Sequence, residues 1–224
     1  FGKNIDQHIL YKKSLLDLEI AYESNTLIAL FLTQLLGKED CKTSTEREEA
    51  LLRLLTPIAK LYSAKSSITS ASEHIEMFGG LGYLEDSNIP VMLRNAQVLS
   101  IWEGTTNVLS LDMLRAIEKE NGLVAYKDFA QEMIASITLP ELKAAKNILS
   151  NKLKTLYQFV GNISSKDAMI GCSRDLAFFI GELTIGLLWM DFIQKSPKDK
   201  YFKALNYWLK FKMNENSLDL YKMM

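Results

Sequence analysis

The stretch EMFGGLGYLEDSNIPVMLRNAQVLSIWEGTTN, residues 76–107, decides how the chain is organised. Three glycines fall within four residues near its start: Gly79, Gly80 and Gly82. Such a cluster ends a helix, because glycine adopts positive φ angles without steric cost. A second glycine turn covers residues 103–105, and the segment between the two turns is long enough for one short helix. Both turns expose backbone, and we expect the short span between them to bring them together around one pocket.

Outside this stretch the sequence is helical in pattern. Apolar residues recur at three- and four-residue spacing, and alternating β-branched runs are almost absent. This periodicity predicts an all-α fold, a helical bundle. The predicted helices are 4–36, 45–78, 89–97, 106–119, 123–136, 140–160, 165–194 and 197–213.

Two capping signals support the first helix boundaries. Asn4 with Gln7, and Thr45 with Glu48, have the spacing of a capping box, in which the two side chains satisfy each other's backbone amides. Gly37 is the expected left-handed stop of the first helix. These signals predict two long helices joined by a polar link.

Composition bounds the fold class and its divisions. The chain has 224 residues, 26 basic and 27 acidic, and 48% are apolar. This supports a full hydrophobic core and excludes a disordered or collagen-like chain. All the dense glycine turns lie before residue 121. We therefore expect one domain over 1–121 that carries chemistry and an additional helical region over 122–224 that serves packing or assembly.

Several partner classes are disfavoured. Net charge is near zero, and a modest lysine run at 143–154 fits the solvated face of a helix better than a binding surface, so nucleic-acid binding through the C-terminal helices is the third and weakest candidate. Cys41 and Cys172 lack disulfide or zinc-site spacing, which favours an intracellular compartment. The longest apolar runs, 27–36 and 183–190, are shorter than the roughly 20 residues of a membrane span, so none is predicted.

Glu103 is the carboxylate that most suggests chemistry. Ile101 and Trp102 precede it and Gly104 follows it, so a partly apolar pocket is expected to raise its pKa toward that of a general base. The alternative is a glutamate at a helix start that interacts with the helix dipole. His8 and His74 stand alone, so no metal site is predicted. Arg94 is expected to tie Glu85 or Asp86 to the fold.

The segments FGGLGYLEDSNIP and LRNAQVLSIWEGTTNVLSLDMLR resemble the C-terminal helical domain of the acyl-CoA dehydrogenase family. Its hallmarks are a Q-x-x-GG-x-GY loop and, some twenty residues later, a Y/W-E-G-T segment. The opening Phe1-Gly2-Lys3 is similar to the family's F-G-K sequence. Together these motifs cover residues 1 to about 120. Trp102, the Leu111-Asp112 pair and the additional C-terminal helical region are more similar to the branch of the family that contains the bacterial alkylation-response homologues.

The resemblance implies a specific chemistry. Members bind FAD and an acyl-CoA thioester; a glutamate removes the α-proton while hydride leaves the β-carbon for the flavin. By resemblance Glu103 is the general base and its own amide is one donor to the thioester carbonyl, with Gly104 beside it in the substrate site. The implied cofactor-binding residues are Phe1, Glu76, Gly79, Gly80, Thr105 and Asn107. Glu76 departs from the pattern, because the family has glutamine there.

The resemblance also implies partners. Family members place a helical domain and a β-domain ahead of this one, and the cofactor commonly lies across a subunit interface, so a homodimer or homotetramer is expected. The expected location is cytoplasmic or mitochondrial. The alternative function is a non-catalytic helical module that binds an acyl ligand or a protein partner and has a regulatory role.

Overall fold

The computed structural model describes residues 2–213, and every regular element in that range is a helix. The expected all-α class is therefore confirmed. The α-helices are α1 (Ile9–Asp40), α2 (Glu46–Met77), α3 (Gly80–Tyr83), α4 (Ile89–Leu99), α5 (Thr106–Lys119), α6 (Gly122–Ser136), α7 (Lys143–Gly161), α8 (Lys166–Lys195) and α9 (Asp199–Lys212). Short 3-10 turns occur at Ile5–Gln7, Glu85–Ser87 and Pro140–Leu142.

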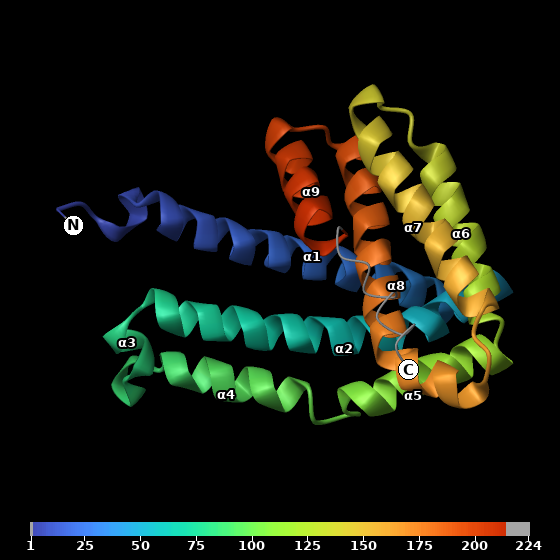
Figure 1. Ribbon diagram of the computed structural model, residues 1–224, viewed down its shortest axis with the longest axis horizontal. Coiled ribbons are helices and arrows are strands. Elements are labelled where there is room, and N and C mark those ends of the chain that lie inside the picture. The colour runs from blue at the N-terminus through green and yellow to red at the C-terminus, as the bar shows by residue number, and fades with distance from the viewer. Residues whose placement is uncertain (1, 214–224) are drawn as a thin grey trace.

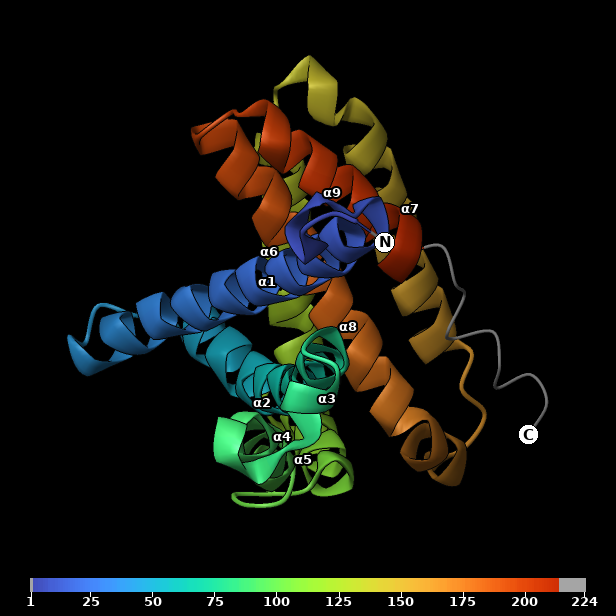
Figure 2. The ribbon, with the colours of Figure 1, turned by 90° about the vertical axis from the view of Figure 1, so that its left-hand side faces the viewer.

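Three helices form an elongated layer. In Figure 1, α1 and α2 run antiparallel, and α4 runs back along α2 from the α3 turn. The helices α6 to α9 stand across one end of this layer. Figure 2, turned by 90°, shows both sides of the α1–α2 pair. The pair has α4 and α5 as neighbours on one side and α9 on the other.

The start of α2 forms as its sequence predicts. The Thr45 hydroxyl accepts from the Glu48 amide at 3.2 Å, and the Thr45 amide donates to the Glu48 carboxylate at 2.9 Å. Lys38 also donates to that carboxylate at 2.5 Å. These bonds favour the ionised form, with Lys38 the largest contributor, and hold the pKa of Glu48 at about 2.

Both ends of α1 differ from the expectation. Asn4 makes no side-chain cap; the Gln7 amide donates instead to the Asn4 carbonyl, closing a 3-10 turn, and α1 begins at Ile9. Gly37 lies inside the helix. The stop comes at Lys42, whose φ is 57°, while the Thr43 amide donates to the Lys38 carbonyl at 2.9 Å. This is a Schellman-type ending in which lysine takes the left-handed position usually held by glycine.

The centre of the molecule is α8, which packs against α1, α2, α5, α6, α7 and α9. Trp189 on α8 is buried, and its indole nitrogen donates to the Ser24 hydroxyl on α1 at 3.0 Å. Among the described residues α8 alone has the length and apolar character of a membrane span, but 78% of that stretch is buried within the bundle. It is packed as a core helix is.

One hydrophobic core crosses the expected boundary at residue 121. The buried cluster joins side chains of α1 and α2 to those of α6, α7, α8 and α9. Asn121 adopts the left-handed conformation, with φ 55°, and links α5 directly to α6. The division at 121 stays a prediction about domain organisation, and the two regions pack as one body around α8.

Candidate functional site

The turn that carries Glu103 connects α4 to α5 and has an unusual backbone. Glu103 has a φ of 55° and Gly104 a φ of 112°. A left-handed conformation costs an ordinary residue about 1–2 kcal/mol, so it persists only where surrounding contacts enforce it. A Cβ at Gly104 would lie 3.1 Å from Leu109 Cδ2. Both the dihedral angle and the close contact explain why glycine follows Glu103.

Lys60 on α2 holds this turn. Its ammonium group donates to the carbonyl of Leu99 at 2.8 Å, of Trp102 at 2.6 Å and of Gly104 at 3.1 Å. An ammonium group has three donors, and all three are used here. Lys60 was not among the residues predicted from the sequence; the available signal was a lysine within the apolar segment 57–62 of a long helix.

The expected apolar enclosure of Glu103 is not formed by the described residues. The Glu103 side chain is exposed, and the neighbouring Ile101 and Trp102 are 61% and 54% exposed. The apolar side chains precede Glu103 in sequence, but they point into solvent instead of folding over the carboxylate. Within residues 2–213, therefore, no described group shields this carboxylate from solvent in the way the sequence predicts.

The cofactor-binding residues predicted next to Glu103 stay close to it in space. Thr105 occupies the N-cap position of α5, but its side chain accepts no hydrogen bond from the first backbone amides of the helix. Asn107, in the first turn of α5, is exposed and accepts a long hydrogen bond of 3.4 Å from Arg174 on α8. This end of α5 presents hydrogen-bonding groups outward.

The Gly79–Gly80 turn has a different character. Gly79 has φ 57° and ψ −136°, a conformation that favours glycine. Apart from the adjoining residues and the backbone of α3 itself, no described atom lies within 4 Å of a Cβ placed at Gly79 or Gly80. Glu76, at the end of α2, is also exposed, and its carbonyl accepts from the Gly79 amide at 2.9 Å. These three predicted cofactor residues form an open backbone surface.

Gly82 is a sterically required glycine, and it was not among the predicted site residues. A Cβ there would lie 2.1 Å from the Ile75 carbonyl oxygen. The glycine therefore lets α3 fold back against the end of α2. The last glycine of the motif thus serves packing, while Gly79 and Gly80 leave the backbone accessible.

The two turns do not share a pocket within one chain, so that expectation is wrong. They lie at opposite ends of α4 (Figure 1). Lys60, beside the Glu103 turn, is 17 residues before Met77 on α2, which is about 25 Å of helix. The 11 residues of α4 are helical and keep the turns apart. Phe1, also predicted to touch the cofactor, lies outside the described residues.

Other candidate residues have structural contacts. Arg94 donates to both carboxylate oxygens of Glu85 at 2.9 and 2.8 Å, as one of the two expected partners, and this bond lowers the pKa of Glu85. The His74 ring shares a hydrogen bond with the Ser70 carbonyl. Over residues 2–213 no cluster of three or more metal-ligating side chains occurs.

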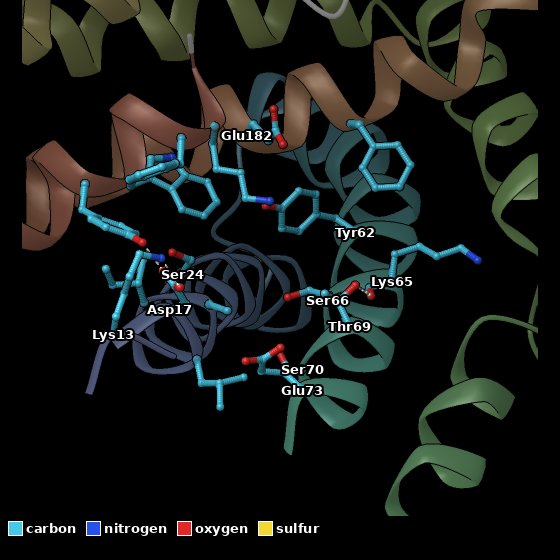
Figure 3. A pocket seen from close by; sticks show the side chains of 18 residues that line it. Lys13, Asp17, Ser24, Tyr62, Lys65, Ser66, Thr69, Ser70, Glu73 and Glu182 are labelled. Carbon is cyan, nitrogen blue, oxygen red and sulfur yellow. Dashed lines mark hydrogen bonds and ion pairs between the residues drawn. The ribbon is translucent and has the colours of Figure 1, made fainter. Parts of the chain in front are cut away.

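A cavity of about 530 Å³ lies between α1, α2, α8 and α9, on the side of α2 away from α4. Figure 3 shows Tyr62, Ser66 and Ser70 of α2 facing Asp17 and Lys13 of α1 across it. Burial, together with the Glu182 carboxylate, raises the pKa of Tyr62 well above its ordinary value. The described lining of this cavity includes no residue of either glycine turn.

Residues 1–118 match the family model of the acyl-CoA dehydrogenase C-terminal domain. Acyl-CoA dehydrogenase family member 11 of Caenorhabditis elegans is 35% identical over 201 residues, 85% of this chain and 32% of that protein. The putative acyl-CoA dehydrogenase AidB of Escherichia coli is 33% identical over 124 residues, 55% of this chain and 22% of that protein.

Solved structures agree with the sequence relatives. The crystal structure of C. elegans ACDH-11 in complex with C11-CoA superposes with a TM-score of 0.88 at 32% identity, over 97% of this chain and 38% of that one. The apo form of Bd2924 gives 0.74 at 38% identity, over 91% and 35%. The chain spans about a third of the length of the C. elegans protein and less of AidB. This chain belongs to the acyl-CoA dehydrogenase family, whose general function is flavin-dependent dehydrogenation.

Proposed function

We propose that this chain is the C-terminal part of a flavin-dependent enzyme that removes hydrogen from the α and β carbons of an acyl-CoA thioester. The observation that carries the proposal is the backbone of the Glu103 turn. Left-handed φ at a glutamate, followed by Gly104 at φ 112°, is a strained arrangement. Such strain concentrates at functional sites, and here it coincides with the glutamate of the family motif.

Glu103 acts as general base in this proposal. An α-proton beside a thioester is weakly acidic, so its removal requires a close base and hydrogen bonds to the oxygen on which charge develops. The carboxylate accepts the α-proton, and the electrons of the broken C–H bond move toward the carbonyl. The Glu103 amide donates to that thioester oxygen, with Gly104 keeping the turn open beside it.

The described residues fit FAD as the hydride acceptor. FAD is rich in hydrogen-bond acceptors and carries phosphates, and the start of α5 offers amides without a side-chain cap, the Thr105 hydroxyl and the exposed Asn107 amide. Gly79 and Gly80 offer open backbone, with Glu76 beside them. When bound, the flavin accepts the hydride from the β-carbon; this chain orients it.

The distance between the Glu103 turn and the Gly79–Gly80 turn supports a homodimer or homotetramer. Within one chain the Glu103 turn and Gly79 are about 25 Å apart along α2, too far for both to contact the same part of one cofactor. A second copy resolves this: each flavin takes Thr105 and Asn107 from one copy, and Gly79, Gly80 and Glu76 from another.

The rest of the active site is proposed to come from upstream helical and β domains of the same protein. Their walls would cover Ile101, Trp102 and the Glu103 carboxylate, which are exposed in this chain. Alone, the chain is expected to lack dehydrogenase activity. We propose an intracellular location, cytoplasmic or mitochondrial, and no nucleic-acid role.

The direct test is the absorption spectrum of the flavin in the full-length protein, recorded without oxygen before and after addition of acyl-CoAs of different chain length. Bleaching of the oxidised band by at least one of them is the expected result. A band that persists with every acyl-CoA, in protein that retains flavin, would contradict the proposed function.

A binding role is the second candidate, and the cavity between α1, α2, α8 and α9 favours it. The cavity has the size of a small-molecule site. Trp208 lines it, and its buried indole nitrogen has no hydrogen-bond partner among the described residues. Acyl-ligand binding without flavin bleaching, abolished by a cavity-filling Ser66→Trp change, would establish this role. Binding unaffected by that change would exclude it.

A further inference from the structure

Lys60 connects the middle of α2 to the turn that carries Glu103. It is half-buried, its neighbours Ile58, Ala59 and Leu61 are buried, and its ammonium group reaches carbonyls on both sides of Glu103. The third carbonyl, of Leu99, is the last of α4. A cation is favourable there, because the carbonyl end of a helix carries partial negative charge.

The bond to the Trp102 carbonyl determines where the Glu103 amide points. That carbonyl and the Glu103 N–H belong to the same peptide unit, and no peptide bond in the described range is cis. In a trans peptide the carbonyl and the N–H lie on opposite sides of the C–N bond. With the carbonyl directed at Lys60 at 2.6 Å, the amide of Glu103 is directed away from α2.

The Glu103 amide has no acceptor among the described backbone bonds. The amides of Ile101 and Trp102 donate to the Val98 carbonyl at 3.0 and 3.1 Å, but no bond leaves the next residue. A donor held in a fixed direction without a partner is what stabilisation of a developing oxyanion requires. The Lys60 ammonium group beside the Trp102 carbonyl also polarises the peptide unit between Trp102 and Glu103, which strengthens the Glu103 N–H as a donor.

We propose that Lys60 is a positioning residue for α-proton removal, fixing the Glu103 amide as the donor to the thioester oxygen and holding the Glu103 backbone in its left-handed conformation. This inference rests on the proposed function. It assigns to α2 a part in the chemistry, because the direction of the donor depends on a side chain 43 residues earlier in the sequence.

The test measures α-proton removal separately from hydride transfer. The probe is an acyl-CoA without β-hydrogens, 3,3-dimethylbutanoyl-CoA, incubated in D2O with the full-length flavoprotein; deuterium incorporation at the α-carbon is followed by mass spectrometry. We expect Lys60→Met to slow exchange about 10- to 100-fold while the dissociation constant of the probe changes less than about threefold. Lys60→Arg should recover part of the rate, because it keeps the charge with a different geometry.

Lys146→Met is the matched control. Lys146 on α7 is also half-buried and donates to a backbone carbonyl, that of Ile137 at 2.9 Å, but it contacts neither the Glu103 turn nor the cavity among the described contacts. Its exchange rate should stay within about twofold of the unmodified protein. An exchange rate for Lys60→Met within about twofold of the unmodified protein would overturn the inference.

Amide hydrogen exchange of the same variants separates positioning from general stability. In Lys60→Met we expect faster exchange confined to residues 99–105. Faster exchange throughout the protein, with Lys60→Arg no better than Lys60→Met, would assign Lys60 a role in folding alone and overturn the inference. The proposed function fails if the unmodified protein exchanges no α-protons of the probe and its flavin band is bleached by no acyl-CoA. If the unmodified protein shows both exchange and bleaching, the proposed function stands and the Lys60 variants alone decide the inference.

Discussion

The two glycine turns at the ends of α4 differ in how they are held. The Glu103 turn is bound by three hydrogen bonds from Lys60, and a Cβ at Gly104 would lie 3.1 Å from Leu109 Cδ2. At the Gly79–Gly80 turn, apart from the adjoining residues and the backbone of α3, no described atom lies within 4 Å of the position a Cβ would take on either glycine, while a Cβ at Gly82 would lie 2.1 Å from the Ile75 carbonyl oxygen. One turn is organised by its own chain, while the other presents bare backbone.

This difference fits two distinct duties. Groups that take part in bond breaking need a fixed geometry before the substrate arrives, since small displacements cost large factors in rate. A backbone surface that receives a cofactor needs access more than rigidity, and glycine without a neighbour provides it. The arrangement therefore supports chemistry at one end of α4 and cofactor contact with a second copy at the other.

The largest expected effect comes from Glu103→Gln. The amide has nearly the shape of the carboxylate but cannot accept a proton at neutral pH, so flavin reduction by a bleaching acyl-CoA should slow by about 10²- to 10⁴-fold. The dissociation constant of the acyl-CoA should change little. Rapid-mixing absorbance at the flavin band measures both. Undiminished reduction would remove the base assignment and the contrast between the turns.

A pair of alanine substitutions in the glycine motif should give a smaller effect, on stability. Gly82→Ala places a methyl group 2.1 Å from the Ile75 carbonyl oxygen, and we expect a loss of about 1–3 kcal/mol in the free energy of unfolding. The methyl group of Gly80→Ala meets no described atom within 4 Å beyond the adjoining residues and the backbone of α3, so the loss should stay within about 0.5 kcal/mol. Urea unfolding compares them. Equal losses would show that the open turn is packed after all.

The smallest effect is expected from Glu85→Gln, which removes the exposed ion pair between the 3-10 turn Glu85–Ser87 and Arg94 of α4. We expect no measurable change in melting temperature at pH 7, because exposed pairs are weak. Arg94 lowers the pKa of Glu85, so any contribution exists above the ordinary carboxyl pKa and is lost as pH falls through the lowered value. Thermal melts at several pH values and salt concentrations check this. A clear loss at neutral pH would mean that the glycine turn is held more firmly than its geometry indicates.

Local signals in the sequence predicted much of the fold. The helix pattern and the Thr45–Glu48 capping box depend on neighbours in the chain, and both are confirmed. The Asn4–Gln7 pair has the same spacing, yet the backbone there closes a 3-10 turn instead. Gly37 failed as a stop because glycine tolerates helical dihedral angles, and the stop moved to Lys42, whose side chain gives no sign of a left-handed conformation.

The sequence named candidate residues for the site, and their roles stay predictions; the geometry of the site could not be predicted. The motif placed Glu103, Thr105 and Asn107 near one another, since they are neighbours in sequence. The role of Lys60 depends on α4 running back along α2, a tertiary contact that no spacing encodes. The same contact separates the two turns, because the helical span between them is rigid. The exposure of the Ile101 side chain could not be predicted either, because it depends on which parts of the folded protein lie opposite that side chain.

The central claim is that the two ends of α4 serve different active sites in an assembly of copies. Co-expression of a Glu103→Gln copy with a Gly80→Trp copy tests it, since Gly80 has open space for the indole and each variant alone should be inactive. If each site takes Glu103 from one copy and Gly80 from another, random pairing leaves about a quarter of all sites with both residues intact. We predict recovery of about a quarter of the unmodified acyl-CoA-dependent flavin reduction in the randomly mixed protein. No recovery in mixed assemblies, with flavin still bound, would contradict the claim.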